Sequence, residues 1–445
     1  MPLKLYNTLS KKKEVFKPIK KGKVGMYVCG PTVNGVPHLG HARQQVSFDI
    51  LRRYLLYLGN KVKFVSNITD IEDKIINAAN EAKVDIKKFS SENMKKHMED
   101  YHELNILKPD VQPKATEYVK EMIDLIKRLE NKDYTYAIDG DGVYFDISKF
   151  KDYGKLSHQN IKNLKLGASG AAIISLDKKK NKEDFVLWKF SKKGEPSWES
   201  PWEKGRPGWH IECSAMSYSI LGLPFDIHGG GQDLIFPHHE DEIAQSEAGY
   251  GKKFANYWVH NGMVNVDGTK MSKSLGNFTT IRDILKNYPG TEIRYFILSS
   301  HYRKPADFSK QLLDSAKASL QRLKNIISEI KQDNKINKSY LDKFEKAMDD
   351  DLNTPKALQV LWALVRDSKA EGKLNTIKKM DQVFGLDLLK KESIKIPKDI
   401  QDLVRQRESA RKAKDWKKAD QLREEIKKRG YKIDDTPEGA RVSTL

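Results

Sequence analysis

The chain has 445 residues, 38% of them hydrophobic, and its 80 Lys and Arg against 61 Asp and Glu give a formal charge of +19. This length accommodates several domains, and the charge suits a polyanionic partner, although a solvated lysine-rich surface has the same composition. No apolar run is long enough to span a membrane, and the first residues lack the apolar core of a signal peptide. We therefore expect a cytoplasmic protein.

The first predicted strand, loop and helix lie near the N-terminus. Met26–Val28 reads as a buried strand, a run of Gly, Pro and Asn then predicts a loop, and apolar residues at helical spacing follow from Phe48 onwards. Parallel sheets bind ligands at such strand-to-helix crossings, and a helix start attracts anions. His38 and His41 are three residues apart there, so they either reach a phosphate together or simply cap the helix.

The chain contains two cysteines, Cys29 after the first strand and Cys213 after a Pro/Gly-rich turn. A disulfide and two small buried hydrophobes are possible interpretations, and a metal site is a third. Two thiolates, an imidazole and a carboxylate make a set that zinc accepts, and His238 and Glu242 lie four apart on one helical face. The competing imidazole and carboxylate are His239 and Glu240.

The elements that follow indicate an interrupted α/β fold. Phe64-Val65 predicts a second strand, and Thr69 follows at a turn, where it caps a helix or lines the site. A polar amphipathic helix then extends to about Leu104. From residue 108 onwards, a helix near Glu117–Glu130, a strand and basic loops indicate an insertion between the two halves of a nucleotide-binding fold.

Two glycine-containing segments belong to the second half. A strand followed by a turn at Gly229–Gly231 is expected to let the backbone approach a ligand, and Asp233 could accept hydrogen bonds from ribose hydroxyls there. Gly268–Gly276 is a Gly/Ser-rich loop that carries Lys270 and Lys273. Mobile ammonium groups suit a polyphosphate whose charge moves during reaction.

Helices dominate the remainder of the chain. Glu292–Ser300 predicts one more buried element, and Asn353-Thr354-Pro355 predicts a helix start with proline at its first position. Apolar residues at steps of three and four form two stripes, which we interpret as the core of a helical bundle. The stripes are Leu313, Ala316, Leu320, Leu323, Ile327 and Ile330, then Leu358, Leu361, Trp362 and Val365.

Two short signatures and several longer segments carry a resemblance. HLGH (38–41) and KMSKS (270–274), in this order, resemble the paired signature of the class I aminoacyl-tRNA synthetases. Over nearly the whole chain, longer segments resemble the cysteinyl-tRNA synthetases. They include YVCGPTV (27–33), NITDIEDKI (67–75), GRPGWHIECSAM (205–216), HGGGQDLIFPHHEDEIAQSE (228–247), KMSKSLGN (270–277) and DDDLNTPKAL (349–358).

The resemblance implies a fold and a ligand set. The implied fold is α/β, a class I Rossmann-like nucleotide-binding domain with an inserted connective domain, followed by a helical bundle and a small C-terminal domain. The implied zinc ligands are Cys29, Cys213, His238 and Glu242, with one zinc per chain that holds the substrate thiol. The implied cysteine pocket consists of Gly30, Thr32, Thr69, Trp209 and His228.

The implied reaction joins L-cysteine to tRNA(Cys) through cysteinyl-adenylate, with Mg²⁺ accompanying ATP. His38, His41, Lys270 and Lys273 are expected to stabilise phosphate charge, and Asp233 is our addition for the ribose. We expect a monomer. The expected segments are 1–107 (catalytic domain, first half), 108–204 (inserted connective domain), 205–260 (catalytic domain, second half), 261–307 (KMSKS-loop and stem-contact region), 308–395 (helical-bundle tRNA-binding domain) and 396–445 (anticodon-binding domain).

Two further expectations concern local departures and the C-terminus. Asn34-Gly35 stands where the family commonly has an aromatic residue followed by Asp, and Gly35 is expected to loosen this loop. Trp416 and Tyr431 are the aromatic residues of the C-terminal segment that could stack on an unpaired base, but the expected role of Trp416 is packing inside the small C-terminal domain. The cations expected to meet tRNA phosphates there are Arg405, Arg407, Arg411, Lys412, Lys417, Lys418, Arg423, Lys427 and Arg429.

Two rival functions share parts of this pattern. A ligase that joins cysteine to an amino-sugar would share the catalytic core but would need no anticodon-binding domain. A catalytically inactive tRNA-binding protein would not need the intact signatures and the four-ligand set. The helical bundle and basic tail disfavour the first rival, and the signatures disfavour the second.

Overall fold

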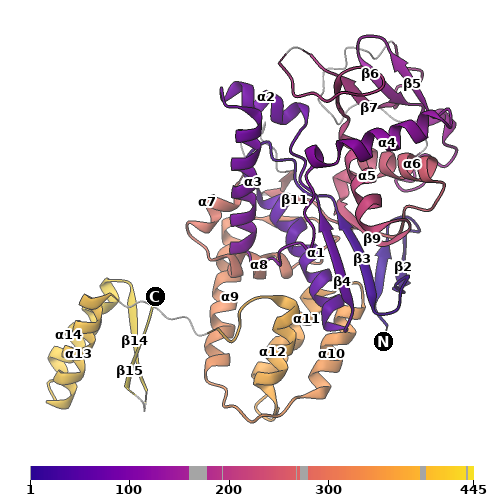
Figure 1. Cartoon of the computed structure of the whole chain (residues 1–445). Coiled ribbons are helices and arrows are strands. Elements are labelled where there is room, and N and C mark those ends of the chain that lie inside the picture. Colours follow the sequence, from indigo (N-terminus) through magenta and orange to yellow (C-terminus); the bar gives the residue numbers. More distant parts are fainter. Residues whose placement is uncertain are drawn as a thin grey trace. The chain divides into compact units, whose positions relative to one another are not determined.

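The computed structural model describes residues 2–159, 178–192, 194–266, 268–270, 279–390, 397–436 and 439–444. The chain forms two compact units, Met1–Leu388 and Leu389–Leu445, which are described separately (Figure 1). Within these described ranges, every helix is too short or too polar to cross a membrane.

The first unit combines α/β and helical parts. Its strands are β1 (Lys4–Asn7), β2 (Lys12–Val15), β3 (Lys23–Val28), β4 (Lys61–Ser66), β5 (Thr135–Ile138), β6 (Gly142–Phe145), β7 (Phe185–Phe190), β8 (Gly205–Pro207), β9 (Phe225–Gly231), β10 (Ala255–Asn261), β11 (Val264–Val266), β12 (Thr269–Lys270) and β13 (Ala306–Phe308). Its helices are α1 (Leu39–Tyr57), α2 (Asp73–Glu81), α3 (Ile86–Glu103), α4 (Val119–Glu130), α5 (Trp209–Leu221), α6 (Glu240–Tyr250), α7 (Ile281–Leu285), α8 (Gly290–Leu298), α9 (Lys310–Ser328), α10 (Lys338–Asp349), α11 (Thr354–Arg366) and α12 (Lys373–Phe384).

A four-stranded parallel sheet in the order β10-β9-β3-β4 positions the site (Figure 1). Successive side chains of a strand point to opposite faces. Met26 and Val28 of β3 therefore pack in the core that contains α1, whereas Tyr27 and Cys29 pack in a core formed with α5 and α6. The predicted strand at Met26–Val28 and the helix after it are confirmed, and Cys29 faces α5 and α6.

The three glycines of the second half do not form the expected turn. Gly229, Gly230 and Gly231 belong to β9 and pair with β10 along its length. A Cβ on Gly229 would lie 2.3 Å from the Phe48 ring of α1, and one on Gly230 would lie 2.8 Å from the His239 ring. The prediction of a turn at these glycines is wrong, because they continue β9 and let neighbouring side chains pack against the sheet.

The segment inserted between β4 and β9 carries its own sheet. Strands β5-β6-β7-β8 are antiparallel, and α4 packs against them. Ile211 and Ala215 of α5 belong to the same buried cluster as Val143 and Trp188 of this sheet. The inserted sheet therefore helps to fix the helix that carries Cys213.

The helices α9 to α12 bury the two predicted stripes in one core with α1 and α8. α11 begins as predicted, with the Asn353 side chain accepting a hydrogen bond from the Lys356 N–H and with proline in the first turn. Glu292–Ser300, predicted as a buried element, coincides largely with the buried helix α8.

The second unit consists of two helices and a hairpin, and it corrects the expectation for Trp416. Arg407 is only 4% exposed and donates two hydrogen bonds to the Asp435 carboxylate, while Arg429 pairs with Asp399 and Glu425. These arginines are engaged inside the unit, as is Arg411 through Asp435. Trp416 is 58% exposed, so the expectation that it packs inside the domain is wrong. The elements are α13 (Lys398–Lys412), α14 (Trp416–Lys428), β14 (Tyr431–Thr436) and β15 (Gly439–Thr444).

Candidate active site

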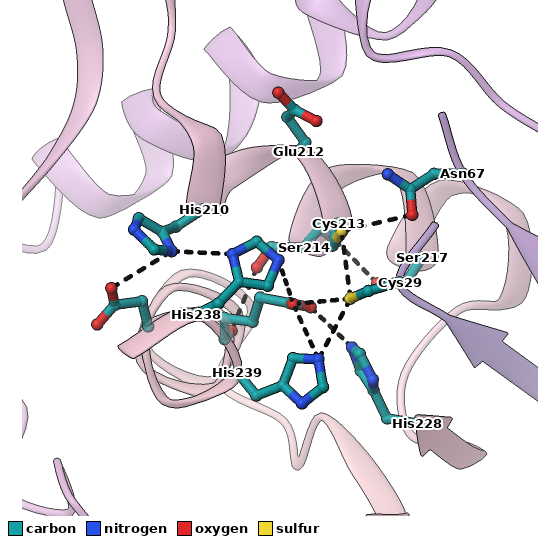
Figure 2. A network of polar contacts seen from close by, with 12 residues as sticks. Cys29, Asn67, His210, Glu212, Cys213, Ser214, Ser217, His228, His238 and His239 are labelled. Carbon is teal, nitrogen blue, oxygen red and sulfur yellow. Dashed lines mark hydrogen bonds and ion pairs between the residues drawn. The ribbon is translucent and has the colours of Figure 1, made fainter. Parts of the chain in front are cut away.

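Four buried side chains from three parts of the fold converge beside the parallel sheet (Figure 2). Cys29 follows β3, Cys213 lies on α5, and His238 precedes α6, which carries Glu242. The Cys29 sulfur lies 3.6 Å from the Cys213 sulfur and 3.3 Å from the Glu242 Oε1. The His238 Nε2 lies 3.1 Å from the same Oε1. The four predicted zinc ligands therefore form one cluster, whose donor atoms all lie within 4.8 Å of one another.

A second group of four donors overlaps the first and shares Cys29 and Glu242. It adds His228, whose Nε2 lies 2.7 Å from the Glu242 Oε2, and His239, whose Nε2 lies 3.3 Å from the Cys29 sulfur. The competing carboxylate named above, Glu240, points elsewhere and accepts backbone N–H groups of the insertion. Of the two competing residues, only His239 reaches the cluster.

The electrostatics of the cluster suit a cation. Burial alone would raise the pKa of Glu242, but the His228 and His238 charges hold the pKa of this carboxyl well below its usual range. Burial likewise opposes ionisation of Cys213, yet hydrogen bonds with Cys29 and His238 lower the pKa of its thiol to about 6. Burial raises the pKa of the neighbouring Cys29 thiol. Acidic oxygen and sulfur donors thus lie together out of water, and a bound metal ion stabilises their ionised forms.

Asn67 and Glu212 belong to this region but were not singled out from the sequence. The Asn67 side-chain oxygen accepts a hydrogen bond from the Gly30 N–H at 2.8 Å and lies 3.7 Å from the Cys213 sulfur. Glu212 accepts a hydrogen bond from the Thr69 hydroxyl at 2.7 Å, and burial raises the pKa of its carboxyl well above the usual range. Their positions inside quoted motifs, NITDIEDKI and GRPGWHIECSAM, were the available signal.

The residues of the expected cysteine pocket lie around the same cluster. A Cβ on Gly30 would lie 1.6 Å from the Asn67 carbonyl oxygen, so this position requires glycine. Thr32 and Thr69 are partners in a parallel β-bridge, in which the Thr69 N–H donates to the Pro31 carbonyl and the Val33 N–H donates to the Thr69 carbonyl. The Trp209 ring stacks on His238 with centroids 4.2 Å apart, so it lies against a predicted ligand. The His228 ring stacks on the Trp258 ring.

The two histidines of HLGH stand at the start of α1. The His38 Nδ1 accepts the Gly40 N–H at 3.0 Å, and the His41 Nδ1 accepts the His38 N–H at 3.1 Å, so both cap the helix. An Nδ1 that accepts leaves the proton of a neutral ring on Nε2. Both rings can therefore cap the helix through Nδ1 and donate through Nε2, and the two alternatives posed by the sequence are compatible.

The segment that follows KMSKS lies next to the HLGH signature. β12 ends at Lys270, whose side chain lies outside the described residues, as does the whole of Lys273. Where the description resumes, the Thr279 carbonyl accepts the Leu39 N–H at 3.2 Å, and the Ile281 N–H donates to the Pro37 carbonyl at 3.0 Å. The segment after KMSKS is thus hydrogen-bonded to the start of the HLGH helix.

Asp233, our candidate for ribose, lies just beyond β9 in the short helical turn η5 (Gln232–Leu234), and it is exposed. The carboxyl end of a strand in a parallel sheet is where a nucleotide binds. The position of Asp233 therefore fits the role that we expected.

Sequence comparisons match known families over most of the chain. A profile described as the tRNA synthetases class I (C) catalytic domain matches residues 15–318, a DALR domain matches 343–389, and a cysteinyl-tRNA ligase anticodon binding domain matches 395–442. A relative from Caldicellulosiruptor saccharolyticus, named cysteine–tRNA ligase, is 45% identical over an alignment of 470 residues that covers 100% of both chains.

Solved structures agree on the fold. Methionyl-tRNA synthetase of Mycobacterium tuberculosis in complex with methionyl-adenylate has a TM-score of 0.60 at 16% identity, covering 82% of this chain and 88% of that chain. LeuRS of Agrobacterium radiobacter K84 in a ternary complex also has a TM-score of 0.60, at 12% identity, with 84% of each chain covered. The α/β class I fold with helical C-terminal parts is confirmed, and the match to an anticodon binding domain disfavours the amino-sugar ligase. The chain belongs to the cysteine–tRNA ligase family of the class I aminoacyl-tRNA synthetases.

Proposed function

We propose that this cysteine–tRNA ligase selects L-cysteine through a zinc ion held by Cys29, Cys213, His238 and Glu242. The observation that carries the proposal is the buried cluster of two thiols, an imidazole and a carboxylate beside the parallel sheet. Zinc accepts this donor set. When bound, zinc supplies a site that takes a thiolate as a ligand far better than a hydroxyl, so cysteine is separated from serine in one binding step.

In the alternative donor group, His228 and His239 are better suited to orienting the metal ligands than to binding the metal themselves. It offers only one thiol, and His239 is already hydrogen-bonded through Nδ1 to the His260 Nε2 at 2.8 Å. His228 contacts the Glu242 carboxylate through Nε2, and the His228 ring stacks on Trp258. Groups that hydrogen-bond ligand residues from outside orient them and tune their basicity. We therefore assign His228 and His239 to positioning Glu242 and Cys29.

The amino acid and ATP would meet at the carboxyl ends of β3 and β9. Gly30, Thr32, Thr69, Trp209 and His228 are the proposed cysteine pocket, and the Trp209 ring on His238 supports its placement beside the metal ligands. The cysteine carboxylate attacks the α-phosphate of ATP, pyrophosphate leaves, and a ribose hydroxyl of tRNA(Cys) then takes the cysteinyl group and releases AMP.

The phosphate charge needs donors that are in place before the reaction. His38 and His41 fit because each Nδ1 accepts a backbone N–H, which sets the Nε2–H tautomer. Lys270 and Lys273 are the proposed mobile cations, Asp233 the proposed ribose acceptor, and Mg²⁺ is proposed to accompany ATP without an assigned protein ligand.

The helical part and the second unit are the proposed tRNA-binding regions. A groove of about 470 Å³ between α9 and α11 is lined by Arg322, Arg366 and Trp362, and Arg366 stacks on the Trp362 ring at 4.6 Å. Within the described part of the chain, neither arginine has an acidic partner, so both are available to phosphates. Exposed Trp416 suits stacking on an unpaired base.

The proposal retains the six expected segments as the division of labour along the chain, a monomeric enzyme, and a cytoplasmic location where tRNA charging serves translation. Its test measures metal content, cysteine-dependent exchange between pyrophosphate and ATP, and charging of tRNA(Cys) on one preparation. We expect about one zinc per chain, exchange with cysteine but not with serine, and charged tRNA. Charging of a glucosamine-like acceptor alone, or metal-free enzyme with full exchange, would contradict it.

A further inference from the structure

Helix α3 carries a fully buried histidine, His97, whose ring lies against the ring of His41 in HLGH. The His97 Nε2 lies 3.0 Å from the carbonyl oxygen of Gly35, in the loop that precedes HLGH. The His97 Nδ1 lies 3.1 Å from the Tyr101 hydroxyl, one helical turn along α3. The His97 ring meets the His41 ring edge to face, with centroids 5.3 Å apart and planes at 70°. One side chain thus touches both the loop and a phosphate-binding histidine.

The partners of His97 fix its tautomer. A backbone carbonyl can only accept a hydrogen bond, so Nε2 carries the proton and donates to Gly35, while Nδ1 accepts from the Tyr101 hydroxyl. Burial lowers the pKa of His97 to about 4, so the ring is neutral near pH 7. Both ring nitrogens are satisfied in this state, which makes His97 a fixed donor.

The hydrogen bond from His97 to the Gly35 carbonyl fixes a loop that has no side-chain contact of its own at Gly35. Gly35 has no side chain, and the sequence predicts a loosened loop there. The carbonyl of the same residue is nevertheless held from α3 by His97. Without this donor the loop would be held only by the contacts of its flanking residues, because Gly35 has no side chain that could form another contact.

The same helix also reaches the segment that follows KMSKS. Asp100 and Glu99 of α3 form ion pairs with Arg282 of α7, at 2.9 Å and 2.5 Å. α7 begins at Ile281, whose N–H donates to the Pro37 carbonyl. Helix α3 therefore contacts both the HLGH helix and the segment that follows KMSKS, although its sequence indicates only a polar amphipathic helix.

We propose that His97 is a positioning residue for the ATP site, which holds the loop at Gly35 and the ring of His41 in place for the phosphates. This inference rests on the proposed role of His41 in ATP binding. His97 does not touch the reacting atoms. Its effect is exerted on ATP rather than on cysteine, because its contacts lie at the loop and at His41 and not at the metal cluster.

Two substitutions separate the two contacts. His97→Phe keeps an aromatic edge against His41 but leaves the Gly35 carbonyl without its donor. His97→Gln restores an N–H donor near the Nε2 position but removes the ring. We expect His97→Phe to raise the KM for ATP in pyrophosphate exchange by about tenfold, the scale of one buried hydrogen bond, and His97→Gln to recover most of it. Zinc content and the KM for cysteine should stay unchanged.

Matched variants exclude a general loss of stability. Lys87→Ala lies on the exposed side of α3 and should behave as the parent, and Leu361→Ala in the bundle core should lower the melting temperature without raising the KM for ATP. A parental KM for ATP in His97→Phe would overturn the inference, as would equal rises in the KM for ATP and for cysteine. His41→Ala tests the proposed ATP-binding role of His41 separately from the positioning role of His97. Retained pyrophosphate exchange in that variant would refute the role of His41 itself.

Discussion

The sulfur atoms of Cys29 and Cys213 lie 3.6 Å apart, although 184 residues separate them in the chain. Alternation along β3 turns Cys29 toward the face that α5 and α6 cover, and the inserted sheet fixes α5 on that face. The two thiols remain free and do not form a disulfide. Two thiols this close to a carboxylate and an imidazole support the metal site on which the proposed selection of cysteine depends.

Replacement of Cys213 by serine should remove most of the zinc and most of the cysteine activation. The serine hydroxyl is a poor zinc ligand and keeps the volume of the side chain, so the fold should persist. Metal analysis and pyrophosphate exchange on the same sample measure both effects. Full zinc occupancy in Cys213→Ser would reject the assignment.

Paired histidine variants distinguish the two overlapping donor groups. His238→Ala should lose zinc, whereas His239→Gln should retain it with weaker affinity, because an outer partner typically contributes a factor of 10 to 100 in metal affinity. Competition with a chelator measures both affinities. Loss of zinc in His239→Gln together with retention in His238→Ala would favour the other donor group.

Lys273→Ala should slow adenylate formation by about 100-fold while the affinity for cysteine stays nearly the same. A cation on a mobile loop is expected to meet charge that develops only in the transition state, and removal of one such donor typically costs this much. Single-turnover kinetics give the chemical step and equilibrium titration gives the affinity. A collapse of cysteine affinity with an unchanged chemical step would contradict this role.

Removal of residues 389–445 should leave pyrophosphate exchange intact and weaken tRNA charging severely. The second unit is compact by itself, and both signatures lie before it, so adenylate formation should not need it. The salt dependence of tRNA binding should also become shallower, since fewer cations release counterions. If the truncated enzyme charges tRNA at the full-length rate and its tRNA binding keeps the same salt dependence, this unit has no tRNA-binding role.

Trp416→Ala should weaken tRNA binding and leave folding unaffected. The ring is 58% exposed, so its removal costs little stability, while stacking on a base contributes about 1–3 kcal/mol. Filter binding or fluorescence quenching measures the affinity, and Tyr431→Phe is the control, because Tyr431 packs partly in the core of its unit. Equal tRNA affinity in Trp416→Ala and the parent would leave Trp416 without a role in binding.

Asp49 should couple stability to acid pH. Burial would raise the pKa of Asp49, but the Arg294 and Arg53 charges outweigh it and hold this pKa below the usual value. A depressed pKa contributes stability above about pH 4, the unfolded value, and this contribution is lost as the pH falls through the folded pKa. Arg294 is fully buried and donates to the Asp49 Oδ2 at 2.5 Å.

Asp49→Asn should therefore lower the free energy of unfolding by about 3–5 kcal/mol at pH 7, because it leaves a buried guanidinium unpaired. Urea unfolding measures the difference in free energy of unfolding between the parent and Asp49→Asn. This difference should stay constant as the pH falls from 7 and should begin to narrow near pH 4. Exposed Asp124→Asn is the control and should change little. A difference near zero at pH 7 would contradict the account.

Much of this architecture follows from local patterns. Met26–Val28, the α1 helix and the start of α11 at Asn353 each depend on short-range periodicity or on capping, so the sequence predicts them. The strand at the β9 glycines cannot be predicted, because a glycine run has the same appearance in a turn and in a strand against which large side chains pack. His97 gave no signal, because its role depends on how α3 lies against a loop more than sixty residues earlier.

Zinc K-edge X-ray absorption, recorded with and without cysteine, tests the central claim most directly. The proposed ligands supply two sulfur atoms, and a substrate thiolate bound to the metal adds a third. We therefore predict two sulfur neighbours in the resting enzyme, three with cysteine and two with serine. One sulfur neighbour at rest would assign the metal to Cys29 with His228, His239 and Glu242, and an unchanged count with cysteine would contradict selection through the thiolate.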